Sequence, residues 1–255
     1  MVKKVISILI ALGFMFVCAV MVNPAEMQGK RYPVVLMYHL IEEEPFTELT
    51  DLFVTPDDFE DQLISLKNAG YEFAFASEYG PISKNAPKRV IITFDDGYAD
   101  NYTKMLPIVE KCGARASVFV VTGFIGNNNF MTEDQLIQMS KSPHIELGSH
   151  TESHIHVDEQ ERYRIVGELL ISKQKLQRIS GQNVSTLTFP EGHTSRKVNR
   201  IAARPRYYKY AFTTHNCKPG FWTNNYAIPR IKVERGVSGD ELLRIIENAQ
   251  YEIAL

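Results

Sequence analysis

An apolar run that ends in two adjacent carboxylates constrains this chain more than any other feature. Residues 90–98 read VIITFDDGY, so five apolar or β-branched residues lead directly into Asp95, Asp96 and Gly97. Such a run predicts a strand buried on both faces, as in a parallel sheet covered by helices. Two carboxylates at its end would repel each other and lose hydration unless a positive charge lies beside them. An Asp-Asp-Gly sequence more often caps a helix or faces water, so the rest of the chain must decide its role.

Strands and helices alternate along the chain after residue 30. Runs rich in β-branched and aromatic residues predict strands at 33–39, 71–76, 89–94, 115–121, 145–150, 185–190, 208–214 and 226–233. Apolar periodicity and capping residues predict helices between Thr55 and Gly70, at 101–112, after Thr132, and at 159–180, 195–203 and 239–250. No internal repeat or linker interrupts this order. The pattern predicts one parallel α/β barrel, in which functional residues follow the strands.

The amino-terminal segment has the pattern of an export signal. MVKK precedes an uncharged apolar run at residues 5–22, and positive charge ahead of such a run is typical of exported proteins. The run of 18 residues is also just long enough to span a bilayer, so a cleaved signal peptide and a retained membrane anchor both remain open for residues 1–29. We expect an exported domain at residues 30–255, secreted or held on the outer face of the cytoplasmic membrane or in the cell wall.

Composition limits the partners and cross-links of this domain. The chain has 28 Lys and Arg and 30 Asp and Glu; without Lys3, Lys4 and Glu26 of the leader, 26 and 29 remain, a formal charge of −3. A nucleic-acid-binding protein needs a net or clustered positive field, so no nucleic-acid partner is expected. Cys112 and Cys217 lie far apart in the sequence and are expected to be two separate thiols.

A pair of histidines follows another predicted strand. Residues 146–156 read ELGSHTESHIH, and His150 and His154 are four apart, so one helical turn would bring both imidazoles to the same side. One carboxylate and two imidazoles make a three-ligand site for a divalent metal, with a position open for water. Adjacent strand residues point to opposite sides, so one of Asp95 and Asp96 can bind the metal while the other acts as a base. The cation would explain how the two carboxylates coexist.

At this point the sequence resembles a known family. TFDDGY and HTESH are similar to the first two motifs of the polysaccharide deacetylases of the NodB-homology class (carbohydrate esterase family 4), and the resemblance covers residues 32–250. It implies that Asp95 is the general base and that Asp96, His150 and His154 hold a divalent metal, zinc being the first expectation. It also implies a single distorted or incomplete (β/α) barrel and the hydrolysis of N-acetyl groups from an amino sugar.

The third motif of the family departs from its usual form. In TFPEG, Pro190 and Gly192 match, but Thr188 stands where the family has Arg and Glu191 where it has an aromatic residue. The backbone N–H of Glu191 can still serve as the oxyanion donor that the resemblance implies. Arg230, in IPRI at another predicted strand end, is our substitute for the missing Arg that orients the base.

The late histidine of the family, which protonates the leaving amine, is also missing. No histidine follows His215, whereas His39 ends the first predicted strand. This arrangement resembles the permuted branch that deacetylates poly-β-1,6-N-acetylglucosamine, and it implies that His39 is the general acid. A structural role for His39 remains the alternative, with His193 and His215 as other candidates for the acid.

The sequence therefore predicts an exported, metal-dependent polysaccharide N-deacetylase, a hydrolase of carbon–nitrogen bonds other than peptide bonds. Its expected substrate is a poly-N-acetylglucosamine, peptidoglycan or chitin type of amino-sugar polymer, and we expect a monomer that meets the membrane only through its amino-terminal segment. Two alternatives remain open: a related metal amidase acting on small amides, and a non-catalytic protein that binds wall polymer or exopolysaccharide. The second would be marked by a lost ligand or base, and none is lost here.

Overall fold

The computed structural model of the protein describes residues 29–45, 48 and 50–251. Residues 1–28 of the predicted leader lie outside this part of the chain, so the structure does not bear on the leader. Within the described ranges, no helix is both apolar enough and long enough to traverse a bilayer.

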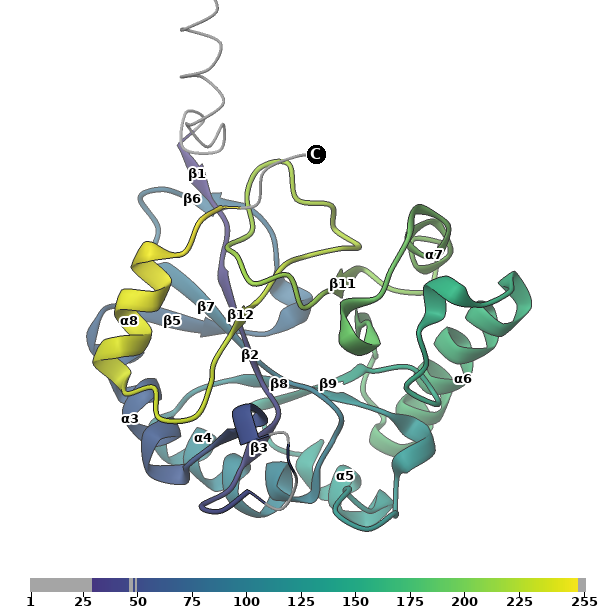
Figure 1. The fold of residues 1–255 in the computed structure, drawn as a ribbon, viewed down its shortest axis with the longest axis horizontal. Coiled ribbons are helices and arrows are strands. Elements are labelled where there is room, and N and C mark those ends of the chain that lie inside the picture. The colour runs from purple at the N-terminus through teal and green to yellow at the C-terminus, as the bar shows by residue number, and fades with distance from the viewer. Residues whose placement is uncertain (1–28, 46–47, 49, 252–255) are drawn as a thin grey trace, which may run out of the picture.

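The fold is built on an eight-stranded sheet whose strand pairs are all parallel (Figure 1). Seven strands follow one another in the order β11 (Tyr210–Phe212), β10 (Thr186–Thr188), β9 (Ile145–Ser149), β8 (Ala116–Val120), β7 (Lys88–Phe94), β2 (Val34–Tyr38) and β12 (Ile231–Lys232). The eighth, β5 (Tyr71–Ala74), pairs with the first four residues of β7, and β8 pairs with the last three. A parallel α/β sheet was the expected class.

The two outer strands of this sheet approach each other. Phe212 of β11 forms a parallel bridge to Ile228, three residues ahead of β12, and Ile228 bonds through its N–H to Ala211 O at 2.9 Å. The sheet is thus curled into an incomplete barrel, as predicted. The strand expected at 226–233 is reduced to the two residues of β12, because Pro229 has no N–H to offer a ladder.

Helices cover the outer face of the curled sheet (Figure 1). They are α3 (Pro56–Asn68), α4 (Leu106–Cys112), α5 (Glu133–Met139), α6 (Arg162–Ser180), α7 (Arg196–Ala202) and α8 (Gly239–Asn248). Thr55 caps α3 by accepting a hydrogen bond from Asp58 N at 3.1 Å, and Thr132 and Gln135 form the expected capping box of α5. The structure thus has the helices that the capping residues predicted.

Two helices begin differently from the prediction. The helix expected at 101–112 opens with a π-helical stretch, η3 (Asn101–Met105), in which Leu106 N bonds to Asn101 O. Pro107 lacks the N–H that a continuous α-helix would use there. The helix expected from residue 159 begins at Arg162, because the turn η5 (Val157–Glu159) forms separately.

Short elements complete the fold. Two small sheets pair β1 (Lys30–Arg31) with β6 (Ile82–Ser83) and β3 (Leu40–Ile41) with β4 (Phe53–Val54). Further 3₁₀ turns are η1 (Thr50–Leu52), η2 (Ala76–Glu78), η4 (Thr122–Phe124) and η6 (Pro190–Gly192). The β1–β6 pair, where the chain enters the described region, lies at the opposite end of the molecule from β3 (Figure 1).

Side chains of the sheet alternate between two apolar layers. In β7, Val90, Ile92 and Phe94 belong to the large core between sheet and helices, whereas Ile91 belongs to a smaller cluster inside the barrel with Val35, Phe119 and Phe212. A period of two along the strand continues the inner face from Ile91 through Thr93 toward Asp95. The alternation therefore directs Asp95 to the interior at the carboxyl end of the barrel.

Candidate active site

Most of the residues singled out from the sequence meet at the carboxyl edge of the sheet. Asp95 and Asp96 follow β7, His150 and His154 follow β9, and His39 follows β2. Arg230 was expected at the end of a strand, but it directly precedes β12. Its side chain reaches Asp95 from inside the barrel. Cys112 and Cys217 are not joined by a disulfide.

Asp95 is held by Arg230 in the floor of the site. Arg230 donates from Nη1 to Oδ1 at 2.8 Å and from Nη2 to Oδ2 at 2.6 Å, and both side chains are buried. Burial acts to raise the pKa of the Asp95 carboxyl, but the Arg230 charge and nearby imidazoles outweigh it, so the net pKa lies below its usual range. Asp95 is therefore ionised and fixed in one orientation.

Asp96 faces two imidazoles. Its Oδ1 lies 3.3 Å from Nε2 of His150 and 3.4 Å from Nε2 of His154. The backbone of Asp96 is left-handed (φ 71°), so its side chain leaves the direction of the strand and separates from Asp95. Burial would raise the pKa of Asp96, yet the two imidazoles hold it well below its usual range. The two adjacent carboxylates therefore point in different directions, as predicted. The cause is the left-handed backbone of Asp96 and not strand alternation alone.

The donor set of Asp96, His150 and His154 fits a divalent metal. Among the described residues, Oδ1 of Asp96 is buried without a hydrogen-bond partner, although both imidazole Nε2 atoms face it. One carboxylate oxygen and two imidazole nitrogens within 4.8 Å of one another match the ligand types of zinc-class ions. A cation among these three atoms would satisfy the orphaned oxygen.

Thr188 sets the tautomer of His150. Nδ1 of His150 lies 3.0 Å from the carbonyl oxygen of Thr188, and Thr188 Oγ1 also contacts Nδ1. A carbonyl oxygen can only accept, so Nδ1 carries a hydrogen and Nε2 is the nitrogen that faces Asp96. In the sequence, Thr188 marks only a missing Arg; its contact with His150 could not be predicted, because it depends on β9 and β10 lying side by side.

A loop positions His150 and His154, so the prediction of a helical turn between them was wrong. Residues 150–154 contain no helix, and Thr151 and His154 have positive φ angles of 68° and 55°. The buried carboxylate of Glu168, on α6, holds the loop by accepting from Ser153 N at 2.8 Å and Glu152 N at 3.0 Å. Glu168 was missed because its sequence context is an ordinary amphipathic helix.

The third motif forms a tight turn next to the site. Glu191 has a left-handed backbone (φ 52°), and among the described residues no hydrogen bond engages its N–H. A Cβ on Gly192 would meet Thr214 N at 2.8 Å, so the neighbouring chain requires glycine there. Pro190 begins the turn and Gly192 ends it. Oε2 of Glu191 lies 3.1 Å from Nε2 of His156, two residues beyond His154, which places Glu191 near the histidine pair.

His39 lies at the same edge, in surroundings that lower the pKa of its imidazole. Asn101 Nδ2 fixes its carbonyl at 2.9 Å, and the charges of Asp96 and Asp95 reach its ring. Burial lowers the pKa of the imidazole more than these carboxylates raise it, so the protonated fraction is reduced rather than enlarged. The role of His39 as a general acid stays a prediction, as do the roles of the other site residues.

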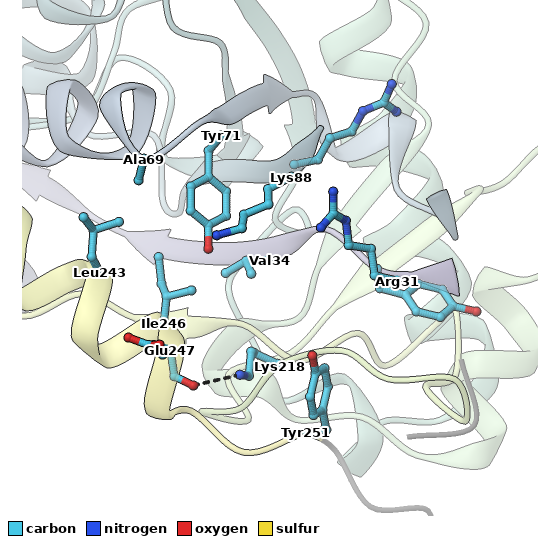
Figure 2. Close-up of a pocket in the computed structure, with 12 residues that line it drawn as sticks. Arg31, Val34, Ala69, Tyr71, Lys88, Lys218, Leu243, Ile246, Glu247 and Tyr251 are labelled. Atoms are coloured by element: carbon cyan, nitrogen blue, oxygen red, sulfur yellow. Dashed lines mark hydrogen bonds between the residues drawn. The ribbon is translucent and has the colours of Figure 1, made fainter. Parts of the chain in front are cut away.

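A separate cavity of about 460 Å³ lies at the other end of the sheet (Figure 2). Val34 and Lys88, the first residues of β2 and β7, line it together with Tyr71 and Ile246. None of the site residues described above contributes to its wall. The cavity is therefore unrelated to the carboxyl-edge chemistry.

Comparison with known proteins agrees with this arrangement. Residues 83–209 match the sequence model of the family described as polysaccharide deacetylase. The Bacillus subtilis protein YxkH, named for the same family, is 29% identical over 221 residues, 84% of this chain and 76% of the relative. A Staphylococcus aureus poly-beta-1,6-N-acetyl-D-glucosamine N-deacetylase is 25% identical over 203 residues, 73% of this chain and 69% of the relative. The Streptococcus pyogenes deacetylase PplD, solved in complex with acetate, superposes with a TM-score of 0.75 at 27% identity, over 85% of this chain and 98% of that one.

A curled parallel sheet with a carboxylate and imidazole cluster at its carboxyl edge defines an α/β protein of the NodB deacetylase class. Residues 83–209 are a polysaccharide deacetylase domain, and the chain is an enzyme of that class. The matched segment contains Asp95, Asp96, His150 and His154, whereas His39 and Arg230 lie outside it.

Proposed function

We propose that this protein hydrolyses N-acetyl groups of an amino-sugar polymer with a divalent metal, zinc first, held by Asp96, His150 and His154. The buried Oδ1 of Asp96, orphaned between two imidazole Nε2 atoms at 3.3 and 3.4 Å, carries the proposal. A metal bound there would supply Lewis-acid chemistry: it would polarise the acetyl carbonyl and lower the pKa of water.

Different side chains around the metal site accept and donate the protons of the reaction. Asp95, ionised and fixed by Arg230, accepts a proton from the attacking water. The free N–H of Glu191 donates to the carbonyl oxygen as negative charge develops on it. His39 delivers a proton to the sugar nitrogen as the carbon–nitrogen bond breaks, giving acetate and an amine.

Aromatic side chains next to the histidines favour a sugar substrate. Tyr98 stacks on Phe130 with ring centroids 4.9 Å apart, Phe130 packs on Phe124 at the same distance, and Phe124 faces the ring of His154 at 6.2 Å. All three aromatic side chains are partly exposed. Sugar rings present flat C–H faces that pack on such surfaces, and apolar lining with few polar groups is typical of ligand sites. The Staphylococcus aureus relatives suggest poly-β-1,6-N-acetylglucosamine as the first polymer to test.

Acetate release from three polymers tests the proposal: poly-β-1,6-N-acetylglucosamine, peptidoglycan and chitin, with small linear and cyclic amides as the comparison for an amidase. We expect release from at least one polymer. Asp95→Asn should keep the metal and lose turnover, whereas Asp96→Asn should lose metal affinity. Release from none of the polymers, or unchanged turnover and metal content in both variants, would contradict the proposal.

We also propose that the domain is exported. The supporting feature is the apolar run at residues 5–22 behind two lysines. Fractionation of cells that express the full chain tests this, and retention of the protein in the cytoplasm would contradict it.

A further inference from the structure

A second group of metal-ligating side chains lies beside the candidate active site. It consists of His156, Glu191 and His193, whose donor atoms all lie within 4.8 Å of one another. His156 leads into η5, Glu191 lies in η6 and His193 follows it, so two separate loops build the group. We name these three residues the rim cluster. It shares no ligand with the group of Asp96, His150 and His154.

The geometry of the rim cluster is compact. The imidazoles of His156 and His193 lie face to face, with ring centroids 3.8 Å apart and an interplanar angle of 8°. Nε2 of His156 is 3.1 Å from Oε2 of Glu191. Each of the three side chains is only partly covered, with 33%, 62% and 40% of the His156, Glu191 and His193 side chains exposed. The cluster is therefore open to ions and water.

The charges around the rim cluster favour a cation. Oδ1 of Asp158 lies 3.6 Å from Nδ1 of His193, and it is buried with no hydrogen-bond partner among the described residues. Oε1 of Glu159 lies 3.7 Å from Nδ1 of His156. Three carboxylates thus surround two imidazoles. One divalent ion held by the Glu191 carboxylate and the two imidazoles would balance these charges, once the rings turn out of their face-to-face stack so that both in-plane lone pairs reach it.

We propose that the rim cluster binds a second divalent ion of the zinc class through His156, Glu191 and His193. Two imidazoles and one carboxylate suit zinc-class ions rather than calcium or magnesium, which prefer oxygen ligands alone. Solvent completes the coordination because the cluster is partly exposed. The ion also anchors the side chain of Glu191, whose strained backbone turn presents the N–H assigned above to the carbonyl oxygen.

Metal stoichiometry tests the proposal without reference to activity. Protein stripped with a chelator is titrated with Zn²⁺ by calorimetry, and with Co²⁺ by visible absorption. We expect two equivalents per chain for the wild type. His156→Gln combined with His193→Gln should bind one equivalent, and Asp96→Asn combined with His150→Gln should also bind one. His215→Gln, which changes an exposed histidine outside both groups, is the matched control and should bind two.

The outcomes separate this proposal from the proposed function. A single equivalent in the wild type, or two in the His156→Gln and His193→Gln variant, would overturn the second site. Thermal unfolding shows whether each variant is folded. If the variant with Asp96→Asn and His150→Gln does not fold, the stoichiometry of the wild type and of the variant with His156→Gln and His193→Gln still decides whether the second site exists. Failure to release acetate would leave the stoichiometry, and hence the rim site, unaffected.

Discussion

Arg230 and Asp95 form a two-pronged ion pair inside the barrel, although 135 positions separate them in the sequence. Two further guanidinium hydrogens reach Thr93 Oγ1 at 3.1 Å and Thr213 O at 2.9 Å. Arg230 is fully buried, so this network fixes both partners. It also explains how two adjacent carboxylates coexist: Asp95 is paired with a guanidinium, and Asp96 faces the two imidazoles.

Removing the guanidinium should destabilise the fold. Arg230→Met keeps much of the buried volume but leaves the Asp95 carboxylate unpaired, so we expect a loss of about 3–5 kcal/mol in the free energy of unfolding. Urea unfolding measures it. Asp95→Asn combined with Arg230→Met removes both charges and should recover part of the loss. Losses that simply add in a double-mutant cycle would show that the pair is not coupled.

Glu168 should control metal affinity from outside the ligand set. Glu168→Gln weakens the acceptor that holds residues 152 and 153, so we expect metal affinity to fall roughly 10- to 100-fold while the ligands remain. Calorimetric titration of the stripped protein measures the change. Arg164→Gln is the comparison variant. It removes the half-exposed ion pair to Glu168 and one hydrogen bond to Ser153 Oγ but leaves both backbone hydrogen bonds of Glu168, so it should cost far less affinity. Equal losses in both variants would contradict the loop-holding role.

Asp100 should make stability depend on pH. Its carboxylate accepts from Ile41 N, and burial raises its pKa to about 7. The folded chain keeps this proton up to about pH 7, whereas the unfolded chain releases it near pH 4, so the free energy of unfolding should fall as pH rises between these values, by at most about 4 kcal/mol. In Asp100→Asn, a neutral isostere, this pH-dependent part of the free energy of unfolding should vanish. Urea unfolding from pH 4 to 8 is the test, and identical pH dependence in both proteins would refute it.

His39→Ala should cut turnover roughly a hundredfold, because the leaving nitrogen would lose the proton donor proposed for it. Metal content should not change, since His39 is not among the three ligands. Acetate release and metal analysis on the same preparation measure both quantities. His215→Ala serves as the control. A large loss in the control, with near-normal turnover in His39→Ala, would move the acid role elsewhere.

Local sequence patterns were sufficient to predict where the candidate active site lies. The apolar run before Asp95 predicted a buried strand, and Thr55 and Thr132 predicted where two helices begin, because strand burial and capping depend on near neighbours in sequence. The positions of Asp95, Asp96 and the histidine pair at one sheet edge then followed from parallel topology.

Contacts between distant segments could not be predicted in this way. The helical spacing of His150 and His154 suggested a turn, whereas Glu168 and two positive φ angles shape a loop. The bond from His150 to Thr188 requires β10 beside β9, and the lowered pKa of His39 depends on burial, which one sequence does not display. The rim cluster joins two loops and was not anticipated at all.

Acetate release during removal and return of metal tests the central claim most directly. The wild type stripped by a chelator, with its metal content checked, should release no acetate, and added Zn²⁺ should restore release. The Asp96→Asn variant should not recover under the same additions. Full acetate release by the metal-free wild type would contradict the account.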